Sequence, residues 1–227
     1  SASKPFVYIK DGKYAGFEVE LMIGFCREYG YRLEFEDTAF AAIMAGVSSG
    51  RYDIGMSGIT ITEERRESVD FSAVNHTEDL VLVIHKQSDV KTFEDYKNAN
   101  VGITTGTYAA TIIHDVFPDA TVKEFASLPD MMLALTQDKI DIILNDVSYY
   151  TCMKWEGMNV DRLEEPYTTT DFGIAFKKGE NAQLREQMNA FIAKIKENGE
   201  YDRLQEKWFG DTEPTECADP STLTGEN

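Results

Sequence analysis

The stretch VGITTGTYAATIIHDVFPDATVKEFASLPDMMLALTQDKIDIILND, residues 101–146, decides the fold class. Short apolar runs that suit strands alternate in it with segments whose apolar residues recur at helical spacing. The pattern predicts strands over 101–104, 122–125 and 140–144, and helices over 108–116 and 128–136. Such alternation is typical of a largely parallel sheet flanked by helices, so the chain is expected to be an α/β protein.

The same alternation continues on both sides of this stretch. Helical spacing predicts further helices over 18–29, 40–47, 147–155, 184–195 and 201–208. Apolar β-rich runs predict strands over 33–35, 52–57, 79–86 and 173–176. The tail 211–227 has two prolines and no periodicity, which predicts a linker. No apolar run approaches the roughly 20 residues that a membrane-spanning helix needs.

Charge and cysteine content exclude several kinds of partner. Lys and Arg total 22 against 40 Asp and Glu, a net charge of -18, which would repel the phosphates of nucleic acids. The three cysteines, Cys26, Cys152 and Cys217, and the three histidines show no zinc-ligand spacing, so no metal or cofactor is expected. One disulfide among the cysteines stays open. The first residues lack the pattern of a signal peptide, so we expect a mature form or an excised domain.

Residues 57–66, SGITITEERR, join a predicted buried strand to a short helix that begins at Thr62. Unpaired N–H groups at a helix start favour a carboxylate. Arg65, one turn along, can clamp that carboxylate with two parallel hydrogen bonds. The residues alone leave a second interpretation open, in which Arg65 is a surface side chain beside glutamates.

Two polar groups stand at corresponding places in the second half of the chain. The turn 104–107, TTGT, precedes a helix and so offers hydroxyl groups and backbone N–H groups at a strand-to-helix junction. Asp146 follows the apolar strand 140–144, at the edge where open α/β sheets bind ligands. Both features also suit plain helix capping, and that alternative stays open.

Six motifs in consistent order across residues 5–210 resemble a known family, the polar amino-acid-binding proteins of ABC importers. They are GFEVEL (16–21), GRYDI (50–54), ITITEER (59–65), VDFS (69–72), VG with GT (101–102 and 106–107), and YDRL with KWFG (201–204 and 207–210). The resemblance implies a type II periplasmic-binding fold with two lobes joined by two hinge strands, each lobe a mixed, mostly parallel sheet flanked by helices. Lobe 1 would comprise 1–84 and 173–210, lobe 2 would comprise 85–172, and 211–227 would be a tail.

The resemblance also implies a ligand site between the lobes. Arg65 matches the family arginine that grips the ligand α-carboxylate, assisted by the backbone of Thr60 and Thr107. Asp146 matches the acid that receives the α-ammonium group, with the Gly58 carbonyl as second acceptor. Phe40 matches a side chain that packs on the ligand, and Phe17 is expected to support this wall. Ser3 stands where relatives often carry an aromatic residue and Lys4 lies beside it, so the identity of the amino acid stays open, an acidic ligand included.

The expected function is therefore to bind a free L-amino acid and deliver it to a membrane-embedded ABC permease, outside the cytoplasm and as a monomer. Catalysis is not expected, although a few relatives are cyclohexadienyl dehydratases. A ligand-sensing domain of a larger receptor is the other alternative.

Relatives begin with a β-strand just before the region that matches 3–6. We therefore expect polypeptide upstream of Ser1 to fill this slot, with the tail segment 222–224 as the alternative occupant.

Overall fold

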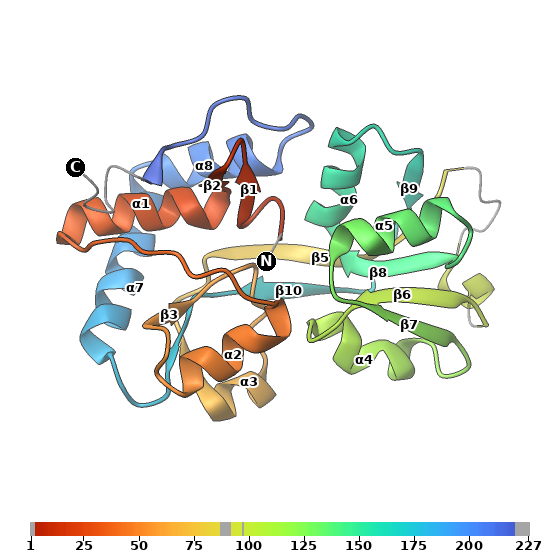
Figure 1. The fold of residues 1–227 in the computed structure, drawn as a ribbon, viewed down its shortest axis with the longest axis horizontal. Coiled ribbons are helices and arrows are strands. Elements are labelled where there is room, and N and C mark those ends of the chain that lie inside the picture. The colour runs from red at the N-terminus through yellow and green to blue at the C-terminus, as the bar shows by residue number, and fades with distance from the viewer. Residues whose placement is uncertain (1–2, 87–91, 97, 221–227) are drawn as a thin grey trace. The chain divides into compact units, whose positions relative to one another are not determined.

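The computed structural model describes residues 3–86, 92–96 and 98–220, and the chain divides into two compact units (Figure 1). Unit 1 comprises Ser1–His76 and Asp171–Asn227, and unit 2 comprises Thr77–Thr170. The sequence placed the boundaries at 84 and 173 instead. Residues 77–84 belong to unit 2 because β5 (His76–His85) pairs from Leu80 to Ile84 with β8 (Ile142–Asp146).

Unit 2 is built on a mixed sheet with the strand order β10-β5-β8-β6-β7, and β9 pairs with β5. Its remaining strands are β6 (Asn100–Thr104), β7 (Thr121–Phe125), β9 (Val160–Arg162) and β10 (Thr168–Phe172). β6 runs parallel to β7 and β8, as the alternation predicted, whereas β5 runs antiparallel to β8. β5 alternates its apolar side chains between two buried clusters, because Leu80 and Leu82 pack in one and Val81 and Val83 in the other.

Helices cover this sheet where the sequence predicted them. They are α4 (Tyr108–Val116), α5 (Leu128–Thr136) and α6 (Val147–Trp155), and a short 3-10 helix spans Phe93–Tyr96. Ser127 caps α5 by accepting the Asp130 N–H through its hydroxyl group at 3.3 Å. The bounds of all three α-helices agree with the predicted ranges. α4 and α5 each bury apolar side chains at helical spacing, whereas α6 buries only Ser148, Cys152 and Met153 and begins directly after β8.

Unit 1 has a two-stranded hairpin and a separate three-stranded sheet. The hairpin is β1 (Tyr8–Lys10) with β2 (Lys13–Ala15), and the sheet has the order β3-β11-β4. These strands are β3 (Ile54–Gly55), β4 (Val69–Phe71) and β11 (Ala175–Lys177). β11 is antiparallel to both neighbours, so the expectation of mostly parallel pairing is wrong for the described sheet of this unit.

The described residues of unit 1 also form five helices: α1 (Phe17–Tyr29), α2 (Phe40–Ser48), α3 (Glu63–Ser68), α7 (Ala182–Glu197) and α8 (Glu200–Phe209). The apolar faces of α1, α7 and α8 meet in one core that also holds the fully buried Trp208. A smaller cluster under α2 contains Ile43 and Val47. Both clusters follow from the helical spacing of apolar residues, since each helix must bury that stripe.

The predicted strand over 33–35 is wrong. Residues 31–39 lie in neither a helix nor a strand, although Leu33 is buried. A strand needs a hydrogen-bonded neighbour for its backbone groups. The next strand along the chain, β3, lies at the end of its sheet and pairs with β11 alone among the described residues.

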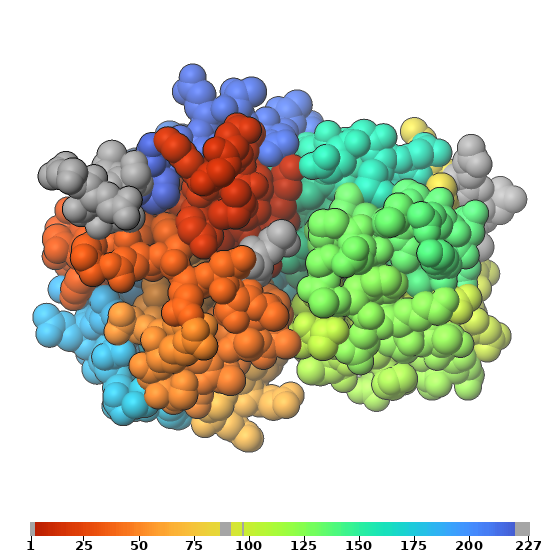
Figure 2. Space-filling view, viewed as in Figure 1, coloured from red at the N-terminus to blue at the C-terminus, as the bar shows by residue number. Residues whose placement is uncertain are grey.

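The prediction that 211–227 is a linker is wrong for its described part, 211–220. Glu213 accepts a hydrogen bond from the Tyr8 hydroxyl group at 3.0 Å and forms an ion pair with Lys10 at 3.3 Å. Asp219 pairs with Lys13 at 2.5 Å. On the face shown in Figure 2, the red N-terminal residues and the blue C-terminal residues of unit 1 lie side by side. The segment is therefore held against the hairpin by charge pairs, which periodicity cannot reveal. Residues 222–224 lie outside the described residues.

Candidate functional site

Arg65 lies on α3, which begins at the predicted N-cap. The Thr62 hydroxyl group accepts the Arg65 backbone N–H at 3.1 Å, so the helix start is fixed by the residue that the sequence indicated. The Arg65 guanidinium group donates from Nη1 to the Thr60 carbonyl oxygen at 2.6 Å. It also lies 6.0 Å from the centre of the Phe40 ring. Within unit 1 the structure thus brings together Arg65, Thr60 and Phe40.

Arg65 is half-buried, and its orientation is constrained from two sides. The carbonyl oxygen of Thr60 holds one edge of the guanidinium group, and the aromatic face of Phe40 favours a cation beside it. Thr60 is itself buried and bridges to Phe172. Such a preorganised guanidinium group suits a planar carboxylate, because its N–H donors form a rigid planar fork.

Gly58 occupies a turn that only glycine fits well. Its φ is +64°, and a Cβ atom there would lie 2.8 Å from the Phe6 ring. Its N–H donates to the Glu18 carboxylate at 3.0 Å, and the Asn75 side-chain amide donates to the same carboxylate at 3.0 Å. The turn that carries the predicted Gly58 carbonyl acceptor is therefore tied to α1.

Glu18 was not predicted as a site residue, yet it holds this turn. Its side chain is fully buried, and burial raises its pKa against the opposing effects of the hydrogen bonds from Asn75 and Gly58. The sequence contains a signal for this role, because Glu18 stands between Phe17 and Val19 at the start of an apolar helix. An acid that is buried in such surroundings needs a partner.

Phe17 and Ser3 are both buried within unit 1. Phe17 is 0% exposed and packs edge-on against Phe6 and Phe209 in the core of this unit. Ser3 is buried, and its Oγ accepts a hydrogen bond from the Ser57 hydroxyl group at 2.6 Å. Lys4, the residue considered for an acidic ligand, pairs with Glu213 at 3.2 Å.

Thr107 of unit 2 is the N-cap of α4, with its hydroxyl group donating to the Thr104 carbonyl oxygen at 2.7 Å. Its side chain makes no capping hydrogen bond to the helix. The hydroxyl group instead tightens the turn 104–107. Thr107 is half-exposed, so α4 and its first N–H groups start near the surface of unit 2.

Asp146 occupies the N-cap position of α6, but its side chain makes no capping hydrogen bond. Glu78 of β5 caps this helix instead. Its carboxylate accepts a hydrogen bond from the Ser148 N–H at 3.0 Å and another from the Ser148 hydroxyl group at 2.8 Å. The start of α6 is thus satisfied by another acid. This weakens the interpretation of Asp146 as a mere helix cap. Asp146 is half-exposed and is the last residue of β8.

The part of the chain that the structure describes contains no group of three His, Cys, Asp or Glu residues able to hold a metal ion. It contains no helix long and apolar enough to cross a bilayer. No disulfide joins Cys26, Cys152 or Cys217 in the structure, which answers the question that the sequence left open. Burial raises the pKa of the Cys26 thiol to about 11, as expected for a small core residue.

The chain is similar to known proteins along most of its length. The model of the bacterial extracellular solute-binding proteins, family 3, matches residues 1–211. The ABC transporter glutamine-binding protein GlnH of Bacillus subtilis (strain 168) is 28% identical over 202 residues, which are 87% of this chain and 74% of GlnH.

Two solved structures are similar along almost the whole chain. An ancestral arginine-binding protein bound to arginine has a TM-score of 0.86 and 30% identity, with 92% of this chain and 96% of that chain covered. The ancestral amino acid-binding protein AncCDT-1, a precursor of cyclohexadienyl dehydratase, has a TM-score of 0.85 and 29% identity, with 91% of each chain covered. The fold therefore matches that of the type II periplasmic-binding proteins, and the chain belongs to the family 3 bacterial extracellular solute-binding proteins.

Proposed function

We propose that this protein binds a free L-α-amino acid outside the cytoplasm and delivers it to an ABC importer. Family membership supports this function, as do the similar proteins whose names state glutamine and arginine as ligands. The observation that carries the proposal is the fixed guanidinium group of Arg65, which the Thr60 carbonyl oxygen and the Phe40 ring orient.

Arg65 receives the ligand carboxylate. An arginine held in place loses little side-chain entropy on binding, and its fork forms two charge-assisted hydrogen bonds with a carboxylate. Thr60 and Thr107 would contribute backbone groups to the same carboxylate. Phe40, already beside the guanidinium group, would lie against the ligand side chain.

Asp146 receives the ligand ammonium group. Its support is the arrangement of α6, whose start is satisfied by Glu78 rather than by Asp146. The carbonyl oxygen of Gly58 would be a second acceptor, in a turn held by Glu18. A zwitterion removed from water needs both a cation and an anion beside it, and Arg65 with Asp146 supplies one of each.

Ligand binding would use both units, because Arg65 belongs to unit 1 and Asp146 to unit 2. The chain passes between the units twice, at residues 76–77 and 170–171. Hinge bending at these passages would let the ligand favour a closed state, because the ligand can touch both groups only there.

The ligand is a polar amino acid rather than an aliphatic one, and it undergoes no reaction. Lys4 is paired with Glu213, which argues against its serving an acidic ligand side chain. A turnover assay with arogenate and prephenate tests the absence of dehydratase activity. Product formation with either acid would contradict that part of the proposal.

Calorimetric titration with each of the twenty L-amino acids tests the function. At least one should bind with a Kd below about 100 μM, a binding free energy of roughly 5 to 6 kcal/mol. D-enantiomers of the same compounds serve as controls, because they cannot place carboxylate, ammonium group and side chain in the same three positions. The proposal fails if no L-amino acid binds below that limit.

A further inference from the structure

The turn that carries the Gly58 carbonyl group is anchored on both sides by hydrogen bonds within unit 1. On one side, the Gly58 N–H donates to Oε2 of Glu18 at 3.0 Å, and the Ser57 backbone also forms a hydrogen bond with this carboxylate. On the other side, the Ile59 carbonyl oxygen accepts the Gly173 N–H at 3.1 Å. The peptide group that presents the Gly58 carbonyl oxygen therefore lies between two anchored groups of the backbone.

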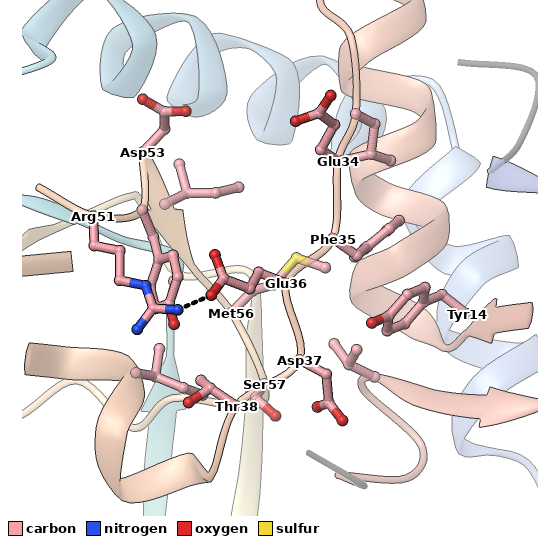
Figure 3. Close-up of a pocket in the computed structure, with 16 residues that line it drawn as sticks. Tyr14, Glu34, Phe35, Glu36, Asp37, Thr38, Arg51, Asp53, Met56 and Ser57 are labelled. Carbon is pink, nitrogen blue, oxygen red and sulfur yellow. Dashed lines mark hydrogen bonds and ion pairs between the residues drawn. The ribbon is translucent and has the colours of Figure 1, made fainter. Parts of the chain in front are cut away.

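This anchoring matters because glycine does not fix its own conformation. Glycine adopts positive and negative φ about equally readily, and Gly58 has a φ of +64°. The segment 51–57 leads into the turn, and Figure 3 shows Ser57 at one end of the pocket that this segment lines. The backbone at Gly58 needs an external constraint, and the fully buried Glu18 carboxylate supplies one.

Asn75 connects this anchor to the two passages of chain between the units. Its Nδ2 donates to Oε1 of Glu18 at 3.0 Å, so the two carboxylate oxygens accept from different donors. Its backbone N–H donates to the Phe172 carbonyl oxygen at 3.0 Å. Asn75 directly precedes the passage at 76–77, and Phe172 directly follows the passage at 170–171. One fully buried asparagine thus joins the Glu18 carboxylate to both passages.

The groups proposed to bind the ligand carboxylate are held in another way. Thr60 bridges to Phe172, and its carbonyl oxygen accepts the hydrogen bond of the Arg65 guanidinium group. This side of the site therefore stays attached to the segment 171–173 without help from Glu18. Loss of the Glu18 hydrogen bonds should displace the acceptor of the ammonium group and leave the arginine in place.

We propose that Glu18 and Asn75 are positioning residues for the ligand ammonium group. Without touching the ligand, they hold the Gly58 carbonyl oxygen where it accepts the ammonium hydrogen bond. This inference rests on the proposed function, in which that oxygen is the second acceptor beside Asp146. Charge-assisted hydrogen bonds of an ammonium group lose more from a displaced acceptor than those of a neutral hydroxyl group. The pair therefore sets the preference for an amino acid over its 2-hydroxy acid, which has a hydroxyl group in place of the ammonium group.

Calorimetric titration of three variants tests this role. Glu18→Met removes both acceptor oxygens, Asn75→Leu removes the side-chain donor, and Glu18→Gln keeps one acceptor for the Gly58 N–H. Met188→Ala is the control, because it removes a fully buried core side chain from α7 and so lowers the thermal midpoint of unfolding. The probes are L-glutamine and L-arginine, each compared with its 2-hydroxy acid and with its α-carboxamide.

Glu18→Met and Asn75→Leu should each lower the preference for the amino acid over its 2-hydroxy acid by at least about 10-fold. The preference for the amino acid over its α-carboxamide reports on Arg65 and should change by less than about 3-fold. Glu18→Gln and Met188→Ala should keep both preferences. An equal loss of both preferences, or a loss in Met188→Ala, would show general damage to the site and overturn the proposal. So would unchanged preferences in Asn75→Leu, which decides the question if Glu18→Met does not fold.

Failure of the proposed function is distinguishable from failure of this inference. If neither amino acid binds the unaltered protein, the choice of ligand is wrong, and hydrogen exchange of the unliganded chain decides the role of the pair. The amides of residues 57–59 should exchange at least about 10-fold faster in Asn75→Leu than in the unaltered protein. The amides of residues 80–84 in unit 2 are the internal reference and should not change. Equal exchange at 57–59 in both proteins would show that the pair does not hold the turn.

Discussion

At the scale of single residues, Glu18 couples the folded state to pH. Burial raises the pKa of this carboxyl above its ordinary value of 4.5, although the hydrogen bonds from Asn75 and Gly58 oppose the change. The folded protein therefore holds the proton more tightly than the unfolded chain. The stability that this proton contributes is fully present below a pH of about 4.5 and is lost as the pH rises through the folded pKa.

Glu18→Gln tests this coupling. The free energy of unfolding is measured by urea titration between pH 4 and 8 for the unaltered protein and for Glu18→Gln. The unaltered protein should be the more stable of the two, by a difference that shrinks as the pH rises. The glutamine side chain can accept only one of the two hydrogen bonds, so a constant loss of about 1 kcal/mol is expected in addition. A difference between the two proteins that does not change with pH would show that Glu18 does not titrate in this range.

Asp146→Asn should abolish measurable amino-acid binding while leaving the thermal midpoint of the unliganded protein unchanged. The amide keeps the shape of the side chain but removes the charge opposite the ligand ammonium group, and losing one partner of a buried charge pair costs about 2 to 5 kcal/mol. Lys4→Ala is the control, because Lys4 pairs with Glu213. Retained affinity in Asp146→Asn, or a comparable loss in Lys4→Ala, would argue against the assigned roles.

The sequence could predict those site residues that stand beside helix starts. Thr62 and Arg65 follow a strand and precede charged residues, so both the cap and the nearby cation can be derived from spacing. Glu18 and Glu78 could not be assigned in this way. Each supports a segment far away in the sequence, residue 58 and residue 148 respectively, and those pairings exist only after the chain has folded.

At the scale of elements, the attachment of the segment 211–220 to the hairpin depends on the negative charge of Glu213. Burial opposes ionisation of Glu213, but hydrogen bonds from Lys4 and Tyr8 and the charges of Lys4 and Lys10 lower its pKa below the ordinary value of 4.5. A lowered folded pKa contributes stability above the unfolded pKa, and this stability is lost as the pH falls through the folded pKa. The segment should therefore loosen in acid.

Glu213→Gln should release this segment at neutral pH. Limited proteolysis should cut the variant between residues 211 and 220 faster than the unaltered protein at pH 7, with the rates converging at low pH. Glu216→Gln is the matched control, because Glu216 is an exposed acid three residues along. Equal cleavage of all three proteins at pH 7 would show that the ion pairs do not hold the segment.

The predicted helices agree with the structure where the apolar periodicity lies within one continuous stretch of sequence. α4 and α5 have the expected bounds because their apolar stripes and flanking strands lie in one continuous stretch of chain. The strand over 33–35 and the linker over 211–220 failed for a common reason. A strand needs a partner elsewhere in the chain, and the tail is held by charges on the hairpin, so neither outcome is encoded in local spacing.

At the scale of the whole molecule, ligand binding should make the protein more compact. Arg65 and Asp146 belong to different units, so a ligand that contacts both must draw the units into one closed state. Small-angle scattering with and without saturating ligand measures the radius of gyration. Asp146→Asn is the control, and its radius should not respond. An unchanged radius in the unaltered protein would contradict closure by the ligand.

The recognition of a free amino acid as a zwitterion is the central claim, and one calorimetric comparison tests it most directly. The best amino-acid ligand and its α-carboxamide, which lacks the negative charge, are titrated into the unaltered protein and into Arg65→Ala. The unaltered protein should bind the amino acid at least about 100-fold more tightly than the amide, a difference of about 2.7 kcal/mol, because only the carboxylate can pair with Arg65. Arg65→Ala should bind both weakly and without preference. Equal affinity of the unaltered protein for acid and amide, or a preference that survives in Arg65→Ala, would contradict the account.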